Sequence, residues 1–218
     1  MHPAAGLPLA YLAGSIPAAY IAGKAKGVDL RQHGSGNLGA TNVVRVLGPA
    51  IGITVFAFDV AKGALPVFYF PRLFPSTQPE YWAIAYGIAA ILGHVRPIFL
   101  LGRGGGKGVA TASGVFLGLS PLSLLVSFSV FVVTLKLSGF VSLGSLLGAV
   151  ALSVALLFTE GPRSPIFWVG VILSAFVFYT HRANIGRLRR GEEHSFKKKD
   201  ADKDKDAGSN GGAAGGAP

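Results

Sequence analysis

Residues 108–135 read GVATASGVFLGLSPLSLLVSFSVFVVTL, a run of 28 residues without a charged side chain. A helix needs about 20 apolar residues to cross a bilayer, so this run is long for one crossing and short for two. Pro121 divides it, because proline lacks a backbone N–H and disfavours a helical conformation at Ser120. We therefore predict two short helices, roughly 108–119 and 121–135.

The rest of the chain has the same apolar character. Half of its 218 residues are hydrophobic, 14% are charged and the mean hydropathy is +0.51, whereas a soluble domain carries about 25% charged residues. Cysteine is absent, which excludes a disulfide scaffold, a thiolate metal site and a cysteine nucleophile. Glycine, with 31 residues, has about twice its average share of roughly 7%. This composition favours a protein that lies mostly in the bilayer.

Other apolar segments of suitable length are 3–23, 50–71, 79–95, 137–158 and 164–180. With the divided run they predict an all-α, polytopic membrane helix bundle of about seven transmembrane helices. Lys24, Lys26 and Arg31 follow the first segment, and basic residues favour cytoplasmic loops, so the N-terminus is predicted outside. Seven crossings return the basic stretch 182–190 to the cytoplasm. Five crossings, with one later segment not crossing, are the alternative.

The net charge of +10 is unevenly distributed. Residues 1–180 hold eleven bases and four acids, so the excess lies mainly in the apolar part. No water-soluble basic module is visible, and nucleic-acid binding is not expected. After Glu193 the chain is charged and then rich in glycine and alanine, without an apolar period. We predict a membrane domain over 1–193 and a disordered tail over 194–218.

Three polar stretches are predicted to share the cytoplasmic surface. They are GSGNLGATNVVRVLG at 34–48, GHVRPIFLLGRGGGKGVATASG at 93–114 and THRANIGRLRRGEE at 180–193. Together they supply arginine, lysine, histidine, asparagine, hydroxyl groups and many glycines, with few acids. Cationic side chains, and glycines whose backbone N–H groups can approach oxygen atoms, are typical of a phosphate site. The stretches therefore predict an anion site, above all for phosphate.

Two nucleotide-binding motifs are matched only in part. Residues 34–39 fit G-x-G-x-x-G and Asp59 lies 20 residues further on, but a membrane segment follows where a βαβ unit is required. Lys107 resembles the lysine of a Walker A loop, but Gly108 stands where serine or threonine is needed. We reject both nucleotide sites and keep the prediction of a phosphate-binding loop.

Several polar and glycine residues also have structural interpretations. Asp59 and Lys62 lie three apart on one helix face, so they form either a neutralising pair or part of the anion site. His33 and His94 are interpreted as interfacial polar residues. Helix packing is expected for Gly139, Gly144, Gly148, Gly161 and Gly170.

The three stretches resemble the motifs of the PlsY family, the bacterial acyl-phosphate:glycerol-3-phosphate acyltransferases, over nearly the whole chain up to Glu193. The matching residues are Ser35-Gly-Asn37-x-Gly39-Ala-Thr41-Asn42-x-x-Arg45, Gly93-His94…Pro97…Gly105-Gly106-Lys107-Gly108-Val-Ala-Thr111 and His181-Arg-x-Asn184-Ile-x-Arg187-Leu…Gly191-x-Glu193. Two departures lie in the second motif. Arg96 replaces an aromatic residue in a segment one residue longer, and Gly104 stands where the family tends to have a base.

The resemblance implies an enzyme of the bacterial cytoplasmic (inner) membrane whose active site faces the cytoplasm. It would transfer a fatty acyl group from acyl phosphate to the 1-hydroxyl of glycerol 3-phosphate, giving lysophosphatidic acid and inorganic phosphate, the first step of phospholipid biosynthesis. The implied partners are these two substrates and the lipid bilayer, without a metal or cofactor, and a monomer suffices. The implied catalytic residues are Ser35, Arg45, Lys107, His181 and Asn184. Substrate binding is assigned to Asn37, Thr41, Asn42, Lys62, Gly104, Gly105, Gly106, Gly108 and Arg187, and a structural role to Glu193.

Acyl phosphate is a mixed anhydride with a good leaving group, so the enzyme needs mainly to position substrates and neutralise charge. The substrate hydroxyl is expected to attack directly, with its proton going to the acyl phosphate itself or to His181; Ser35 is an alternative nucleophile. A transporter of phosphorylated metabolites is the competing interpretation, but no internal repeat is visible. A metal-dependent phosphotransferase would need a cluster of carboxylates that four acids in 1–180 do not supply.

Overall fold

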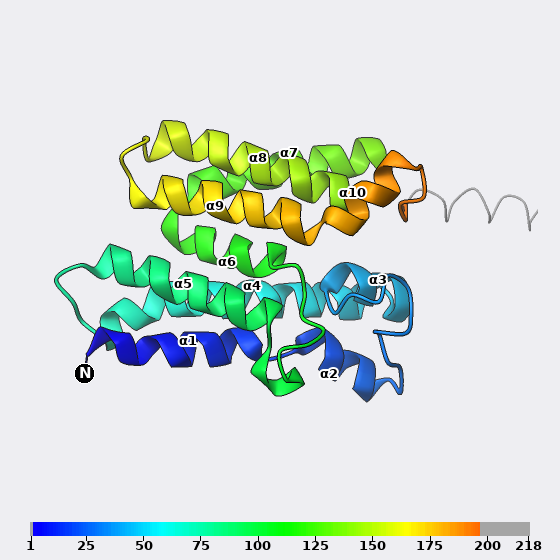
Figure 1. Ribbon diagram of the computed structural model, residues 1–218, viewed down its shortest axis with the longest axis horizontal. Helices are drawn as coiled ribbons and strands as arrows, with labels where there is room; N and C mark the ends of the chain where they lie inside the picture. The colour runs from blue at the N-terminus through cyan, green and yellow to red at the C-terminus, as the bar shows by residue number, and fades with distance from the viewer. Residues whose placement is uncertain (1, 197–218) are drawn as a thin grey trace, which may run out of the picture.

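Over residues 2–196, the part of the chain that this computed structural model describes, all regular secondary structure is helical (Figure 1). The all-α prediction is therefore confirmed for these residues. In chain order the elements are η1 (Pro3–Ala5), α1 (Gly6–Ser15), α2 (Ala18–Ala25), α3 (Ala40–Leu47), α4 (Pro49–Leu73), α5 (Pro79–Val95), η2 (Ile98–Leu100), α6 (Val109–Leu119), α7 (Pro121–Ser138), α8 (Val141–Thr159), α9 (Pro165–Thr180) and α10 (Arg182–Arg189).

The predicted break in the 108–135 run is confirmed. Ser120 leaves the helical conformation after α6, and Pro121 begins α7. Proline suits this first helical position because its missing N–H would have no partner within the helix. The first apolar segment, 3–23, differs from the single helix expected there. Pro17 divides it into α1 and α2, because a proline inside a helix removes a hydrogen bond and clashes with the preceding turn.

The helices are suited to a bilayer. Among residues 2–196, five helical segments are long and apolar enough to cross a membrane: Pro3–Ala25, Pro49–Leu73, Pro79–Leu100, Pro121–Ser138 and Val141–Thr159. α9 and α10, bent by 58° relative to each other, make a sixth if they form one span. α6 has only 11 residues, and the predicted count of seven depends on this short helix.

α6 lies between two groups of helices (Figure 1). α1, α4 and α5 form the group on one side, where α4 and α5 contact α6, and α7, α8 and α9 form the group on the other, where α7 and α9 contact it. Glycine brings α4 and α6 into backbone contact, since a Cβ atom on Gly63 would lie 2.1 Å from the Thr111 carbonyl oxygen. On the opposite helix, a Cβ on Gly114 would lie 1.9 Å from the carbonyl oxygen of Val60.

The glycines predicted to pack between helices fall into two groups. Gly144, Gly148 and Gly170 do lie at helix contacts, and a Cβ on Gly170 would stand 2.2 Å from a Leu156 side-chain carbon. Gly139 and Gly161 have a different role. Their φ angles are +79° and +81°, just beyond the ends of α7 and α8. Glycine is favoured at such helix ends because it adopts this backbone conformation without strain.

The three polar stretches meet at one end of the bundle, beside α2, α3 and α10, as the sequence predicts (Figure 1). The turns 74–78 and 160–164 lie at the opposite end. The predicted disordered tail lies outside the described residues from 197 onward. Its first residues, 194–196, instead contact the bundle, because the backbone N–H of Phe196 donates to the Gly139 carbonyl at 3.0 Å.

Candidate active site

The polar stretches surround a cavity of about 670 Å³ at this end of the bundle. Its walls differ in character. Phe56, Phe128, Phe131, Leu135 and Val141 form an apolar side from α4, α7 and α8. Ten of the predicted site residues line the cavity: Ser35, Asn37, Thr41, Asn42, Arg45, Lys107, Gly108, His181, Asn184 and Glu193.

Asn42 organises the loop that carries Ser35. Its side chain is fully buried, and its Oδ1 accepts a hydrogen bond from the Ser35 backbone N–H at 2.8 Å. Its Nδ2 donates to the carbonyl oxygens of Leu30 and His33, at 3.1 and 3.0 Å. All of these contacts are within the loop, so the structure gives Asn42 a positioning role where the sequence suggested substrate binding.

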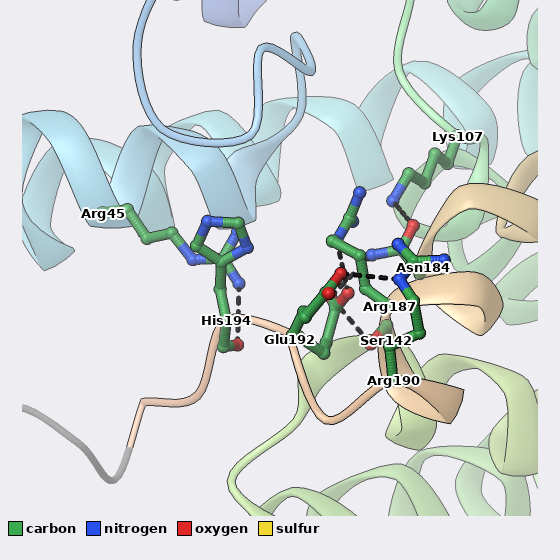
Figure 2. A network of polar contacts seen from close by, with 9 residues as sticks. Arg45, Lys107, Ser142, Asn184, Arg187, Arg190, Glu192 and His194 are labelled. Atoms are coloured by element: carbon green, nitrogen blue, oxygen red, sulfur yellow. Dashed lines mark hydrogen bonds and ion pairs between the residues drawn. The ribbon is translucent and has the colours of Figure 1, made fainter.

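Lys107 begins a chain of polar contacts that joins two of the motifs (Figure 2). Its Nζ donates to Asn184 Oδ1 at 2.5 Å, and Asn184 Nδ2 donates to Glu193 Oε1 at 2.7 Å. The other oxygen of Glu193 accepts from Arg187 Nε at 2.8 Å, and Ser142 Oγ donates to Oε1 at 3.1 Å. Glu193 thus uses both carboxylate oxygens to anchor α10 and α8 beside Lys107. Arg187 is paired with Glu193 and does not line the cavity.

The electrostatics of this end favour binding of an anion. Burial lowers the pKa of Lys107 to about 8; Glu193 opposes this shift, and Arg187 and Arg45 add to it. Burial also lowers the pKa of Arg45, again with Glu193 opposing and Arg187 adding. Burial alone would raise the pKa of Glu193, but its hydrogen bonds outweigh that effect and lower it. Within residues 2–196, Arg45 and Lys107 belong to none of the ion pairs, so their charges are available to a bound anion.

Arg45 reaches the cavity from α3 and meets the end of the described chain. Its Nη2 donates to the His194 carbonyl oxygen at 3.3 Å, and its guanidinium lies 5.3 Å from the centre of the Phe196 ring. The sequence assigned both partners to the tail. An aromatic residue three positions after Glu193, in an otherwise polar segment, is the only signal that marks them.

His181 is buried where α9 ends and α10 begins. Its Nδ1 lies 2.8 Å from the Val177 carbonyl oxygen. A carbonyl only accepts hydrogen bonds, so Nδ1 carries the hydrogen and Nε2 of the neutral ring is an acceptor. The adjacent Thr180 Oγ1 lies 3.1 Å from the Val177 carbonyl oxygen of its own helix and 3.3 Å from the Lys107 carbonyl oxygen, so its one hydrogen is shared between α9 and the glycine-rich loop.

The glycine loop differs from the expected phosphate cradle. Gly104, Gly105 and Gly106 lie beside a separate cavity of only about 10 Å³. A Cβ on Gly106 would lie 2.1 Å from His94 Nε2, and one on Gly105 would lie 2.1 Å from the Val95 carbonyl oxygen. These two glycines therefore let the loop pack closely on α5, and only Gly108 reaches the main cavity.

Lys62, to which the sequence assigned substrate binding, also lies outside the main cavity. Its buried Nζ is 2.8 Å from Asp59 Oδ1, and it donates to the Ile16 carbonyl oxygen at 3.0 Å. Ile16 stands at the break between α1 and α2. The Lys62 ammonium therefore neutralises Asp59 and is a second donor to the Ile16 carbonyl, which also accepts from the Ala18 backbone N–H at 3.1 Å.

Comparisons of the sequence with known proteins identify the family of this chain. The family model described as glycerol-3-phosphate acyltransferase matches residues 4–191. Proteins named glycerol-3-phosphate acyltransferase are similar: that of Geotalea daltonii is 47% identical over 189 residues, covering 87% of this chain and 95% of the relative. That of Aquifex aeolicus is 41% identical over 188 residues, covering 86% and 95%.

Two crystal structures of PlsY (YgiH), an integral membrane glycerol 3-phosphate acyltransferase, share the fold. The glycerol 3-phosphate form has a TM-score of 0.82 at 38% identity, and the lysophosphatidic acid form has a TM-score of 0.79 at 37% identity. Each match covers 89% of this chain and 95% of the other. Like them, this chain is a multi-pass membrane protein, and it belongs to the glycerol-3-phosphate acyltransferase family typified by PlsY.

Proposed function

We propose that this protein transfers a fatty acyl group from acyl phosphate to the 1-hydroxyl of glycerol 3-phosphate, releasing lysophosphatidic acid and inorganic phosphate. The observation that carries the proposal is the cavity itself. Arg45 and Lys107 stand at its polar side, and Phe128 and Phe131 stand at its apolar side. An acyl phosphate has the same two parts, an anionic head and an apolar chain, and glycerol 3-phosphate adds a second phosphate.

In the proposed reaction the substrate hydroxyl attacks the acyl carbonyl directly. The new ester C–O bond forms as the bond from the carbonyl carbon to the phosphate oxygen breaks. The hydroxyl proton leaves on the departing phosphate or on His181 Nε2, which is the free acceptor of the neutral ring. Ser35 and Asn184 hydrogen-bond the substrates, and Arg45 and Lys107 neutralise the phosphate charge that develops during transfer.

The remaining proposed roles follow from position in the cavity wall. Asn37, Thr41 and Gly108 line the cavity and present polar groups to glycerol 3-phosphate. Glu193 supports the site from behind, because it holds Asn184 while Asn184 holds Lys107.

The activity is tested with the purified full chain in lipid or detergent, supplied with acyl phosphate and glycerol 3-phosphate. We expect release of inorganic phosphate that requires glycerol 3-phosphate and matches the lysophosphatidic acid formed. Acyl-CoA and acyl-carrier protein, offered instead of acyl phosphate, are expected to give no product. An absence of phosphate release from folded protein would contradict the proposal and favour the transporter.

The lowered pKa of Lys107 predicts that the activity falls at alkaline pH. With a pKa of about 8 in the free protein, its ammonium is charged below this pH and neutral above it. We expect kcat/KM for glycerol 3-phosphate to fall about tenfold per pH unit above pH 8, because the neutral amine no longer attracts phosphate. The measurement is a pH–rate profile from about pH 6.5 to 9.5.

The matched variant for this profile is Lys107→Arg, because a guanidinium stays charged throughout this range. Its kcat/KM is expected to be lower overall but independent of pH up to about 9.5. An alkaline fall of the same size in the variant would assign the titration to another group.

We place the cavity at the cytoplasmic face of the bacterial inner membrane, with seven crossings and the N-terminus outside. Support comes from the alternation of α4 to α9 between the two ends of the bundle and from the basic residues near α2 and α10 (Figure 1). Because the chain has no cysteine, single cysteines report sidedness directly. In intact cells, an impermeant maleimide should label Arg163→Cys, whereas it should label Lys26→Cys only after the membrane is opened. The reverse pattern would invert the topology.

A further inference from the structure

The chain turns back towards the cavity after α10. Gly191, with φ +70°, follows the helix, and its N–H donates to the Leu188 carbonyl at 3.2 Å. The N–H of Glu192 donates to the Arg187 carbonyl at 2.9 Å, so the last turn of α10 is closed by two hydrogen bonds. Residues 191–196, which we call the C-terminal strap, then run from this turn towards α3.

The strap is anchored at two points. At its start, the buried Glu193 carboxylate accepts hydrogen bonds from Asn184, Arg187 and Ser142. At its end, the Phe196 N–H donates to a carbonyl in the turn between α7 and α8. The segment between these anchors therefore has little freedom to move relative to the cavity.

The strap also contacts Arg45, through His194 and Phe196. Arg45 lies 149 residues before His194 in the chain. The His194 carbonyl accepts one guanidinium hydrogen bond, and the Phe196 ring lies against the guanidinium and also lines the cavity. Arg45 otherwise projects from α3, a helix of 8 residues. A long arginine side chain loses rotamer freedom when it binds an anion, and contacts that hold it beforehand reduce that loss.

We propose that Phe196 is a positioning residue that holds the Arg45 guanidinium ready for the phosphate of the substrate. The ring supplies a flat, electron-rich face for the cation, and the strap supplies a carbonyl for one of its N–H groups. The remaining N–H donors of Arg45 stay available to a phosphate. This role rests on the proposed function of Arg45 and extends the site beyond the residues that the three motifs contain.

The experiment compares aromatic and aliphatic residues at position 196 in the full chain. Phe196→Leu keeps apolar volume but removes the ring, and we expect a rise of about 5- to 30-fold in KM for the substrate whose phosphate Arg45 binds, acyl phosphate or glycerol 3-phosphate, with kcat little changed. Phe196→Tyr and Phe196→Trp keep a ring face and should retain KM near that of the wild-type protein. Glu192→Ala, an exposed strap residue paired with Arg190, is the matched control and should leave both constants unchanged.

A double-mutant cycle with Arg45→Lys separates positioning from general loss of packing. If Phe196 acts through the guanidinium, Phe196→Leu has a smaller effect in the Arg45→Lys background than in the wild-type protein. Equal effects in both backgrounds, or wild-type KM in Phe196→Leu, would overturn the proposal. These results leave the proposed function intact as long as Arg45→Ala is impaired, whereas an active Arg45→Ala variant would remove the premise itself. Thermal unfolding of each variant checks that the strap variants remain folded.

Discussion

Lys107→Ala is expected to lower kcat/KM for acyl transfer by about 10²–10³-fold, the effect of removing one preorganised group that stabilises developing charge in an acyl-transfer transition state. The Lys107 ammonium is half-buried at the cavity and hydrogen-bonded to neutral Asn184, so no carboxylate neutralises it directly. A phosphate that enters the cavity becomes its first ionic partner. The measurement is phosphate release at several concentrations of both substrates.

Lys26→Ala is the control for this variant, because Lys26 is an exposed lysine on the loop after α2 and does not line the cavity. It should keep full activity. Thermal unfolding and gel filtration establish that Lys107→Ala remains folded, and Lys107→Met provides a variant that retains most of the buried volume. Turnover at the wild-type rate in either folded variant would refute the assignment of Lys107 to phosphate binding.

The second large effect is expected for Arg45→Ala, which should lower kcat/KM by about 10²–10³-fold. The guanidinium is held at the cavity by His194 and Phe196, and two parallel N–H···O bonds to a phosphate are its strongest mode of binding. Arg45→Lys restores the charge without the planar fork, so only part of the activity should return. Steady-state kinetics with each substrate varied in turn measure both variants.

Arg189→Ala is the matched control for Arg45, because Arg189 is an exposed arginine at the end of α10 and does not line the cavity. Its kinetic constants should equal those of the wild-type protein. If Arg45→Ala and Arg189→Ala reduce activity equally, the effect comes from the overall positive charge of this membrane face, and the specific contact of Arg45 with phosphate is disproved.

Much of the fold could be predicted from local sequence. Proline acts on its own residue and the one before it, so Pro121 marks the division between α6 and α7 without knowledge of any partner helix. The same rule applied to Pro17 marks the break between α1 and α2, but Pro66 and Pro71 lie inside α4 without ending it, so proline alone identifies only candidate breaks. The sequence did not show whether Gly139 ends a helix or packs between helices, because a glycine among apolar residues is compatible with either role.

The candidate site was predictable in its main residues and less so in their roles. Arg45, Lys107 and His181 carry chemistry that few other side chains supply, so their types and their motifs point to the cavity. Asn42 and Gly106 gave the same polar or glycine-rich signal. In the fold both residues stabilise loops. Asn42 accepts a hydrogen bond from the Ser35 backbone N–H, and Gly106 packs against His94.

By itself the sequence determined a cysteine-free, all-helical membrane protein with an anion site at one end, since hydropathy, proline and charge act over a few residues. Only the tertiary structure decided which cations are free to bind an anion. It realised the Lys62–Asp59 ion pair, one of the two alternatives that their spacing left open, and it joined Arg187 to Glu193 beyond the end of α10. It also brought Phe196 to Arg45 from the far end of the described chain. That last contact depends on how whole helices pack, and spacing along the chain does not encode the partner of a charge that lies far away in sequence.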